Sequence, residues 1–415
     1  MAIGICLLLF FEPLAFGGVP EPAILILETS AGLLFILWAA GRIAGPDGQL
    51  AQSPLFAPIL LFAALIAAQL VLNLSAYWYP TWEKSLLWAA YGILLFLVSQ
   101  CLRREPWQWW FAMALTVYGF AVALFAIAQN LAGNGRFYWV YPNQAGGVFF
   151  GPYPNHAHYS GLMEMLIPFP LVFAMAAFSS MPVRIFCASA AVVMSSSVFL
   201  SKSRGGVFAF VVELAVLTIL SAQGRRMRSQ VKLLGVFAIL LVLWLMMVPP
   251  SGLWQSFLQA EEPGPGRLTM LKDSLKMVLH RPLLGWGFGT FYVVYPSFRS
   301  FYTNLIVNAA HNDFVELAVE TGLVGFALMI WFLYRLYRTG LSRIRHWRHQ
   351  PRAGVTLAAL VGCAGLIAHS LMDFNLQVPA NAALFFVLTA IATTSVTKTG
   401  SAASRSPISS PGEND

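Results

Sequence analysis

Long apolar runs recur along almost the whole chain and restrict it to folds that place them in a membrane. Runs of about 17–25 residues are long enough to cross the hydrocarbon core as helices. The sequence predicts such spans near residues 2–16, 22–41, 54–74, 83–101, 107–130, 159–178, 183–200, 205–222, 232–249, 311–335, 354–372 and 379–397. The expected fold class is therefore all-α, a polytopic transmembrane bundle of about twelve helices.

The composition excludes a set of soluble domains, although 415 residues are enough for several. The chain is 58% hydrophobic and only 10% charged, with a mean hydropathy of +0.69, whereas soluble domains carry about 25% charged residues. We expect a membrane domain over residues 1–398 with an inserted loop at 251–310, and a disordered cytoplasmic tail over residues 399–415. The first apolar run lacks a basic start and a small-residue cleavage site, so we expect a first spanning helix rather than a signal peptide.

The net charge of +8 reflects membrane topology rather than binding to nucleic acid. If the spans alternate in direction, 16 of the 25 Lys and Arg residues fall on one side. These residues are Arg42, Arg103, Arg104, Arg184, Arg225, Arg226, Arg228, Lys232, Arg335, Arg338, Arg343, Arg345, Arg348, Arg352, Lys398 and Arg405. The positive-inside rule makes that side cytoplasmic and places both termini there. Any chemistry is then expected on the opposite, outer side of the membrane.

Nothing in the sequence indicates a metal or another cofactor. The four cysteines lie within or at the ends of apolar runs and predict no disulfide and no CxxC-type metal site; they are Cys6, Cys101, Cys187 and Cys363. His156 and His158 are two residues apart with no third ligand nearby, which is too few for a zinc site. The outer segment 130–159 is rich in aromatic residues, which fits an interfacial belt or, alternatively, a platform for sugars.

Residues 201–206, Ser-Lys-Ser-Arg-Gly-Gly, join two apolar runs on the outer side and carry the first candidate site. An arginine at this depth normally needs a partner, and the two glycines let another group approach the backbone closely. A helix that begins here presents free N–H groups beside Arg204, a combination that suits a phosphate. Alternatively, Lys202 and Arg204 anchor the helix end at the lipid headgroups.

Residues 266–280 of the outer loop have the spacing of an amphipathic helix, with an apolar face at Leu268, Leu271, Leu275, Val278 and Leu279. Arg267, at its start, is either a second cationic ligand for a diphosphate or a solvated side chain. The glycine run at 285–289 lacks the strand and helix of a nucleotide site. We expect it to form a tight turn near a ligand.

His311 stands where this polar loop meets the next apolar run, and it can accept a proton near neutrality. Asp313, Glu316 and Glu320 share the opposite face of the expected helix and either take part in function or pair with basic residues of neighbouring helices. The remaining candidates are the pair His369 and Asp373 and the single residue Glu213.

His369 and Asp373 are one helical turn apart, so that Asp373 either orients His369 or the pair ties helices together. Glu213, in the middle of a span, is expected to have a buried partner.

Together these stretches resemble the bacterial O-antigen ligase and polymerase superfamily, which are polytopic glycosyltransferases that use lipid-linked sugars. Three stretches carry the resemblance: Ser203-Arg-Gly-Gly206, Arg267 with His280-Arg-Pro-Leu-Leu-Gly-Trp-Gly-Phe-Gly289 behind it, and His311-Asn-Asp-Phe-Val-Glu-Leu317. The stretches Asn155–Met165 and His369–Asn375 also look like family sequence, and the likeness spans roughly residues 140–390.

The resemblance implies a GT-C-like membrane enzyme of lipopolysaccharide or polysaccharide biosynthesis with a periplasmic active site. It implies an undecaprenyl-diphosphate-linked glycan as donor, and inverting transfer without a metal. Arg204 and Arg267 would hold the diphosphate, and His311 would act as base on the acceptor hydroxyl or assist the leaving group. Arginine suits this role because it neutralises a departing diphosphate through bidentate contacts. The remaining substrate-binding candidates are Lys202, Ser203, Gly205, Gly206, Asn312, His156, His369 and Asp373.

Three readings of the function stay open. We favour a ligase, and its acceptor stays open between lipid A core, a growing polysaccharide and a protein. A polymerase of the same superfamily is the first alternative. A transporter or lipid flippase is an alternative of a different class, but transporters place charged sites at the midplane, whereas here the polar residues gather at one face.

Overall fold

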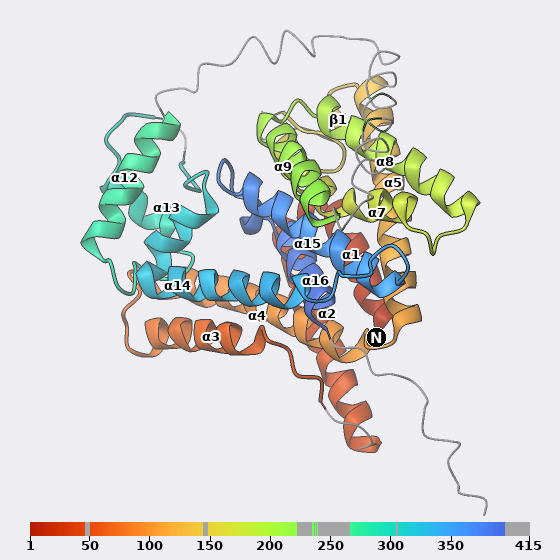
Figure 1. Cartoon of the computed structure of the whole chain (residues 1–415). Helices are drawn as coiled ribbons and strands as arrows, with labels where there is room; N and C mark the ends of the chain where they lie inside the picture. The colour runs from red at the N-terminus through yellow and green to blue at the C-terminus, as the bar shows by residue number, and fades with distance from the viewer. Residues whose placement is uncertain are drawn as a thin grey trace, which may run out of the picture.

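The computed structural model describes residues 1–45, 50–143, 148–221, 266–303 and 306–394, together with Gly235, Phe237 and Ile239. The described part is helical apart from one two-stranded hairpin, so the all-α prediction is confirmed (Figure 1). The α-helices are α1 (Ala2–Leu14), α2 (Glu21–Ala44), α3 (Phe56–Val71), α4 (Trp78–Cys101), α5 (Glu105–Leu131), α6 (His156–Leu166), α7 (Pro168–Met175), α8 (Met181–Leu200), α9 (Arg204–Ser221), α12 (Gly266–His280), α13 (Phe291–Val294), α14 (Asp313–Leu341), α15 (Pro351–His369) and α16 (Pro379–Thr393).

The smaller elements lie in the connections. Short 3-10 helices are η1 (Phe16–Gly18), η3 (Tyr295–Ser297) and η4 (Asn375–Gln377), and the hairpin pairs β1 (Arg136–Phe137) with β2 (Tyr141–Pro142). The span expected at 232–249, apart from three single residues, lies outside the described residues. The same holds for residues 251–265 of the outer loop and for the tail at 399–415.

Seven of the described helices are long and apolar enough to cross a membrane, namely α2, α4, α5, α8, α9, α14 and α15. Helices α1, α3 and α16 are apolar but shorter, with 13, 16 and 15 residues, against roughly 20 for a full span. The span expected at 159–178 is divided, because Pro168 begins a new helix after α6 ends. These helices support a multi-pass membrane protein, and the number of twelve spans stays a prediction.

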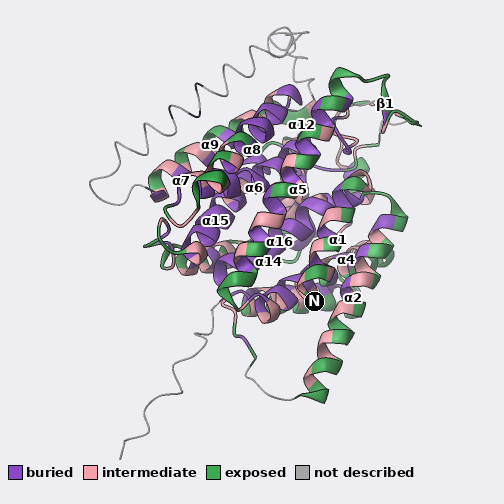
Figure 2. Cartoon of the chain, turned by 90° about the vertical axis from the view of Figure 1, so that its right-hand side faces the viewer, coloured by how far each residue is buried: buried purple, intermediate pink, exposed green. Residues whose placement is uncertain are grey.

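Helices α15 and α16 form the centre of the bundle, and α2 lies at its edge with much of its surface exposed (Figure 2). Small residues bring the central helices close together. A Cβ atom at Gly362 of α15 would lie 2.8 Å from the carbonyl oxygen of Met165 in α6. The backbones of α6 and α15 therefore touch, and this contact fixes their outer ends relative to each other.

Helices α12 and α13 pack beside the start of α14, at one end of the bundle (Figure 1). The predicted helix at 266–280 is confirmed over its described residues, and it ends at His280. Leu268, Leu275 and Leu279 of its apolar face are exposed, whereas the residues buried against the rest of the protein include Met270 and Met277. Helical spacing shows that a helix has two faces, but the neighbouring segments decide which face is covered.

Helix α14 is interrupted at Gly322, whose backbone has φ 64° and ψ −167°. The glycine run at 285–289 packs against this break, and the backbone N–H groups of Trp286 and Gly287 donate to the carbonyls of Val319 and Glu320 at 3.0 Å. The tight turn was expected near a ligand. The group that approaches Gly285 is instead the backbone of Glu320, 2.4 Å from the position of an added Cβ.

The break at Gly322 gives a stability prediction. A Cβ at this position would lie 2.3 Å from the carbonyl oxygen of Leu283, in a backbone conformation that side chains disfavour. Gly322→Ala is therefore expected to destabilise the protein by about 2–3 kcal/mol, measured as a lower Tm in detergent. Gly32→Ala is the matched control, because nothing lies within 4 Å of its added Cβ. Equal Tm values for the two variants would contradict the tight contact.

Candidate functional site

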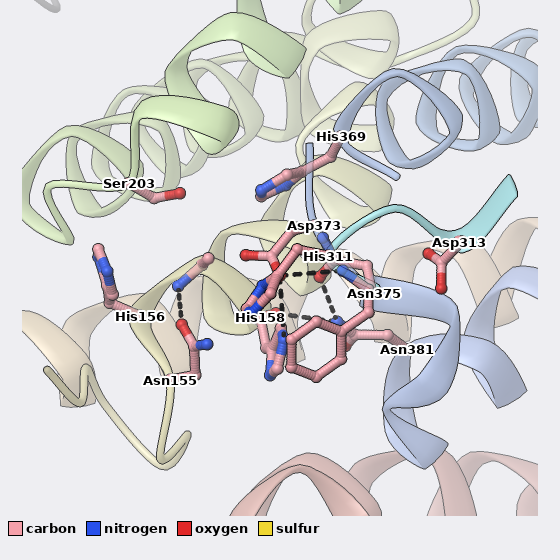
Figure 3. A network of polar contacts seen from close by, with 12 residues as sticks. Asn155, His156, His158, Ser203, His311, Asp313, His369, Asp373, Asn375 and Asn381 are labelled. Carbon is pink, nitrogen blue, oxygen red and sulfur yellow. Dashed lines mark hydrogen bonds and ion pairs between the residues drawn. The ribbon is translucent and has the colours of Figure 1, made fainter. Parts of the chain in front are cut away.

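The starts of α6, α9 and α14 and the end of α15 meet at one place in the structure (Figure 3). The imidazole Nδ1 of His156, in the first turn of α6, lies 2.7 Å from the carbonyl oxygen of Ser201, just before α9. The side-chain amide of Asn312 donates to the carbonyl of Leu371 at 2.9 Å, just beyond the end of α15. Stretches that are far apart in the sequence thus form one cluster of polar side chains.

His311 lies at the partly open side of this cluster and contacts Asp373. The imidazole Nδ1 is 3.4 Å from Oδ1 of Asp373, and the exposed fraction is 29% for the His311 side chain and 6% for that of Asp373. Because Asp373 engages Nδ1, Nε2 is the nitrogen left to accept a proton. The ring of Phe374 packs edge-on against the imidazole at 5.0 Å between centroids.

His311 was expected to open the following helix, but α14 begins two residues later. Its backbone φ is 51°, which is outside helical geometry. Asn312 is the N-cap, and its side-chain oxygen accepts from the backbone N–H groups of Phe314 and Val315 at 3.1 Å each. The left-handed conformation turns His311 out of the helix and toward Asp373.

Asp373 was considered as the residue that orients His369, but in the structure its partner is His311. Nδ1 of His369 instead bonds both carboxylate oxygens of Glu164, at 2.8 and 3.1 Å. The expectation relied on the one-turn spacing of residues 369 and 373. It fails because α15 ends at His369, so Asp373 lies in a turn that points its side chain elsewhere.

The charges around Asp373 keep its carboxylate ionised. Burial raises the pKa of Asp373, but the hydrogen bond with His311 and the nearby histidine charges outweigh burial and hold the pKa well below its usual range. Burial also lowers the pKa of His158 to about 4, so His158 is neutral near pH 7 and contributes little to this effect. A depressed carboxyl pKa adds stability above the unfolded value of roughly 4, and this stability is lost only as the pH falls through the lower folded value.

The His311–Asp373 contact predicts a marked effect of Asp373→Asn. The amide keeps the size of the side chain but removes the charge that fixes the imidazole tautomer. We expect kcat for transfer to fall roughly 10²-fold, with little change in the donor KM. Steady-state kinetics of the purified variant would test this expectation. Unchanged kcat would mean that the contact serves only the fold.

The first turn of α9 supplies cations and free backbone donors. Ser203 is the N-cap, because its Oγ accepts from the N–H of Gly206 at 3.0 Å. Arg204 is exposed and Lys202 half-buried, and neither side chain makes an ion pair or hydrogen bond with another described residue. Added Cβ atoms at Gly205 and Gly206 would lie 2.5 Å from Nε2 of His369 and from Cβ of Ser160. Because residues 205 and 206 are glycines, the side chains of His369 and Ser160 can pack directly against the start of α9.

Arg267 lies in the first turn of α12 with its side chain exposed. Its charge acts on His156 in the cluster. Burial lowers the pKa of His156, and the positive charges of His369 and Arg267 lower it further. The Ser201 carbonyl and the Asp373 carboxylate act in the opposite direction and raise it. Lys202 and Arg204 thus bring positive charge to the start of α9, and Arg267 adds positive charge near His156, which suits an anionic ligand.

The acids that follow His311 have structural partners. Glu316 accepts from the N–H of Ala310 at 2.8 Å, Glu320 from Phe291 at 3.1 Å, and Asp313 from Leu376 at 3.0 Å. None of the three forms an ion pair with a basic side chain of the described residues, although the charge of Lys84 in the neighbouring α4 acts on all of them. Their hydrogen bonds go to backbone N–H groups of the loops that surround His311. They hold the loop before α14 and the segment after α15 in place.

Glu213 also departs from expectation. It is buried in α9, and neither carboxylate oxygen has a hydrogen-bond partner among the described residues. The sequence analysis also assigned no role to Glu164, although a carboxyl inside an apolar run is itself a signal of function. Within the described ranges, no three His, Cys, Asp or Glu side chains converge as metal ligands do, and metal independence stays a prediction.

A comparison with protein-family models matches residues 189–330 of this chain to the family described as O-antigen ligase. The matched region includes Arg204, Arg267 and His311, but it ends before His369 and Asp373. A comparison with curated proteins gives no match.

Proposed function

The family match supports placing the chain in the O-antigen ligase/polymerase superfamily, and from this premise we propose that it transfers a glycan from undecaprenyl diphosphate to an acceptor hydroxyl. The observation that carries the proposal is the His311–Asp373 pair beside the unpaired cations at the start of α9. A proton acceptor next to an anion site is what displacement of a sugar from a diphosphate requires.

The proposed reaction is a single inverting displacement. Nε2 of His311 accepts the proton of the acceptor hydroxyl while the hydroxyl oxygen forms a bond to the anomeric carbon of the sugar. The bond from that carbon to the diphosphate oxygen breaks, and undecaprenyl diphosphate leaves with the electron pair. Arg204 and Arg267 neutralise the charge that develops on the leaving group, and no step needs a metal.

An apolar groove next to the cluster supports a lipid-linked donor. It has a volume of about 740 Å³ and lies between α9, α14 and α15, with Val212, Tyr334 and Ile367 in its walls. Leu371 belongs to the groove and also accepts the hydrogen bond of Asn312 beside His311. Val212 is eight residues beyond Arg204, or about 12 Å along the helix. A prenyl chain in this groove would have its diphosphate near the start of α9.

The placement in the cell is part of the proposal. The basic residues that the positive-inside rule assigns to the cytoplasm include Arg343 and Arg352, which both donate to the carbonyl of Thr394. With that side cytoplasmic, His311 and Arg204 face the periplasm of a bacterial inner membrane. We favour ligation to lipid A core, and polymerisation of polysaccharide uses the same site and the same donor.

The deciding experiment is transfer by the purified chain in nanodiscs that contain undecaprenyl-diphosphate-linked glycan. Lipid A core and a polysaccharide acceptor are supplied in separate reactions, and mass spectrometry identifies the product. Transfer to lipid A core supports a ligase, and extension of the polysaccharide supports a polymerase. If neither acceptor receives glycan and the donor lipid crosses the membrane of liposomes that contain the chain, the protein is a flippase and not a glycosyltransferase.

In cells, a deletion strain separates the two enzymatic functions. Loss of a ligase leaves long glycan chains on the carrier lipid, whereas loss of a polymerase leaves single repeat units on the acceptor. A gel of surface polysaccharide distinguishes these outcomes.

A further inference from the structure

A second histidine–carboxylate pair lies beneath the proposed donor site. His369, the last residue of α15, and Glu164, in α6, both have an exposed fraction of 0%. The two carboxylate oxygens of Glu164 engage Nδ1 of His369 at 2.8 and 3.1 Å. Nε2 of the imidazole is buried without a hydrogen-bond partner among the described residues.

The unpartnered nitrogen is directed at the start of α9. An added Cβ at Gly205 would lie 2.5 Å from Nε2 and 2.7 Å from Cδ2 of His369. Gly205 follows Arg204 and belongs to the first turn, where backbone N–H groups have no partner within the helix. Figure 3 shows the His369 ring between α15 and the segment that carries Ser203. A buried polar atom without a partner thus faces a helix end that suits an anion.

We propose that Glu164 is a positioning residue for the donor diphosphate and acts through His369. This inference rests on the proposed function and adds a buried pair to the exposed arginines. Glu164 accepts the Nδ1 proton, which fixes the ring orientation and presents Nε2 to the first turn of α9. With Nδ1–H held by the Glu164 carboxylate, a protonated Nε2–H can donate to an anion at the start of α9, where the positive end of the helix favours the same anion. The pair therefore strengthens diphosphate binding specifically.

The two histidine–carboxylate pairs divide the reaction between them. His311 with Asp373 is partly open to solvent and serves the acceptor hydroxyl. His369 with Glu164 is enclosed by α6, α9 and α15 and serves the diphosphate. Loss of the second pair should weaken donor binding and leave the acceptor KM unchanged.

The test compares two buried glutamates in the same region. Glu164→Gln removes the carboxylate charge that holds His369. Glu213→Gln makes the same change at a second buried carboxyl, which packs against Gly365, one helical turn before His369. The probe is farnesyl diphosphate, and its affinity for the full chain in nanodiscs is measured by microscale thermophoresis. We expect Glu164→Gln to raise Kd about tenfold, the size of one charge-assisted hydrogen bond, and Glu213→Gln to leave it within about twofold.

A double-mutant cycle separates positioning from a general effect on folding. If Glu164 acts through His369, Glu164→Gln has no further effect on Kd in a His369→Ala background. Gly205→Ala provides a second route, because its methyl group displaces the ring while Glu164 remains, and it should raise Kd by a similar factor. The acceptor KM of all these variants should match that of the parent chain.

Two results would overturn the inference. Equal Kd values for the Glu164→Gln and Glu213→Gln variants, in a chain that still transfers glycan, would remove Glu164 from the donor site and leave the proposed function intact. Failure of the parent chain to bind farnesyl diphosphate or to transfer glycan would instead remove the proposed function, and this inference with it.

Discussion

Replacing His311 by alanine is expected to lower the rate of glycan transfer by about 10²–10⁴-fold, the range for loss of a positioned general base. The acceptor hydroxyl would have to lose its proton to water, because the nearest other imidazoles, His158 and His369, are buried and the Nδ1 atom of His156 is engaged by the Ser201 carbonyl. His158 has an exposed fraction of 6% and His369 of 0%. The measurement is single-turnover transfer by the purified variant, with the protein level and Tm followed in parallel.

Alanine also removes the partner of the buried Asp373 carboxylate, so a second variant separates chemistry from stability. His311→Gln keeps an N–H donor for Asp373 but has no group that titrates near neutrality. It should remain folded and be as inactive as the alanine variant. His280→Ala is the matched control, since that histidine is exposed on α12 and contacts the carbonyl of Lys276. Near-normal activity of His311→Gln would show that another group is the base.

The sequence anticipated the helices well because an apolar run reports directly on the length needed to cross a bilayer. The runs at 83–101 and 354–372 correspond to α4 and α15 within a few residues. The helix at 266–280 was also located, because a Pro-Gly-Pro-Gly breaker precedes it. The sequence did not show which face of this helix is buried, because burial depends on α13 and α14, which lie elsewhere in the sequence.

The site was predicted in its parts but not in its pairings. Motif spacing singled out His311, Asp373 and His369 before any geometry was known, yet it joined Asp373 to the wrong histidine. The spacing rule assumes that the helix continues, and α15 ends between these two residues. The pairing of Glu164 with His369 spans 205 positions. Only the close packing of α6 on α15 brings that pair together, and a single sequence carries no direct signal of such a contact.

Removing the charge of Arg204 is the second change with a large expected effect. Arg204→Ala should lower kcat/KM for the donor by about 10²–10³-fold, because a preorganised donor that faces developing charge is worth that much in catalysis. The side chain is exposed and makes no ion pair or hydrogen bond with another described residue, so its loss should leave the Tm nearly unchanged. The measurement is steady-state transfer at varied donor concentration, alongside thermal unfolding.

Two further variants show what the site needs from residue 204. Arg204→Lys keeps the charge but loses the planar fork that contacts two phosphate oxygens, so its activity should fall between those of the parent and alanine forms. Arg136→Ala is the control: this exposed arginine bonds the carbonyl of Val140 within its own hairpin, and its loss should not change transfer. If Arg204→Ala is as active as Arg136→Ala, residue 204 is a headgroup anchor. The diphosphate would then have to be held by Arg267 and the backbone N–H groups of α9.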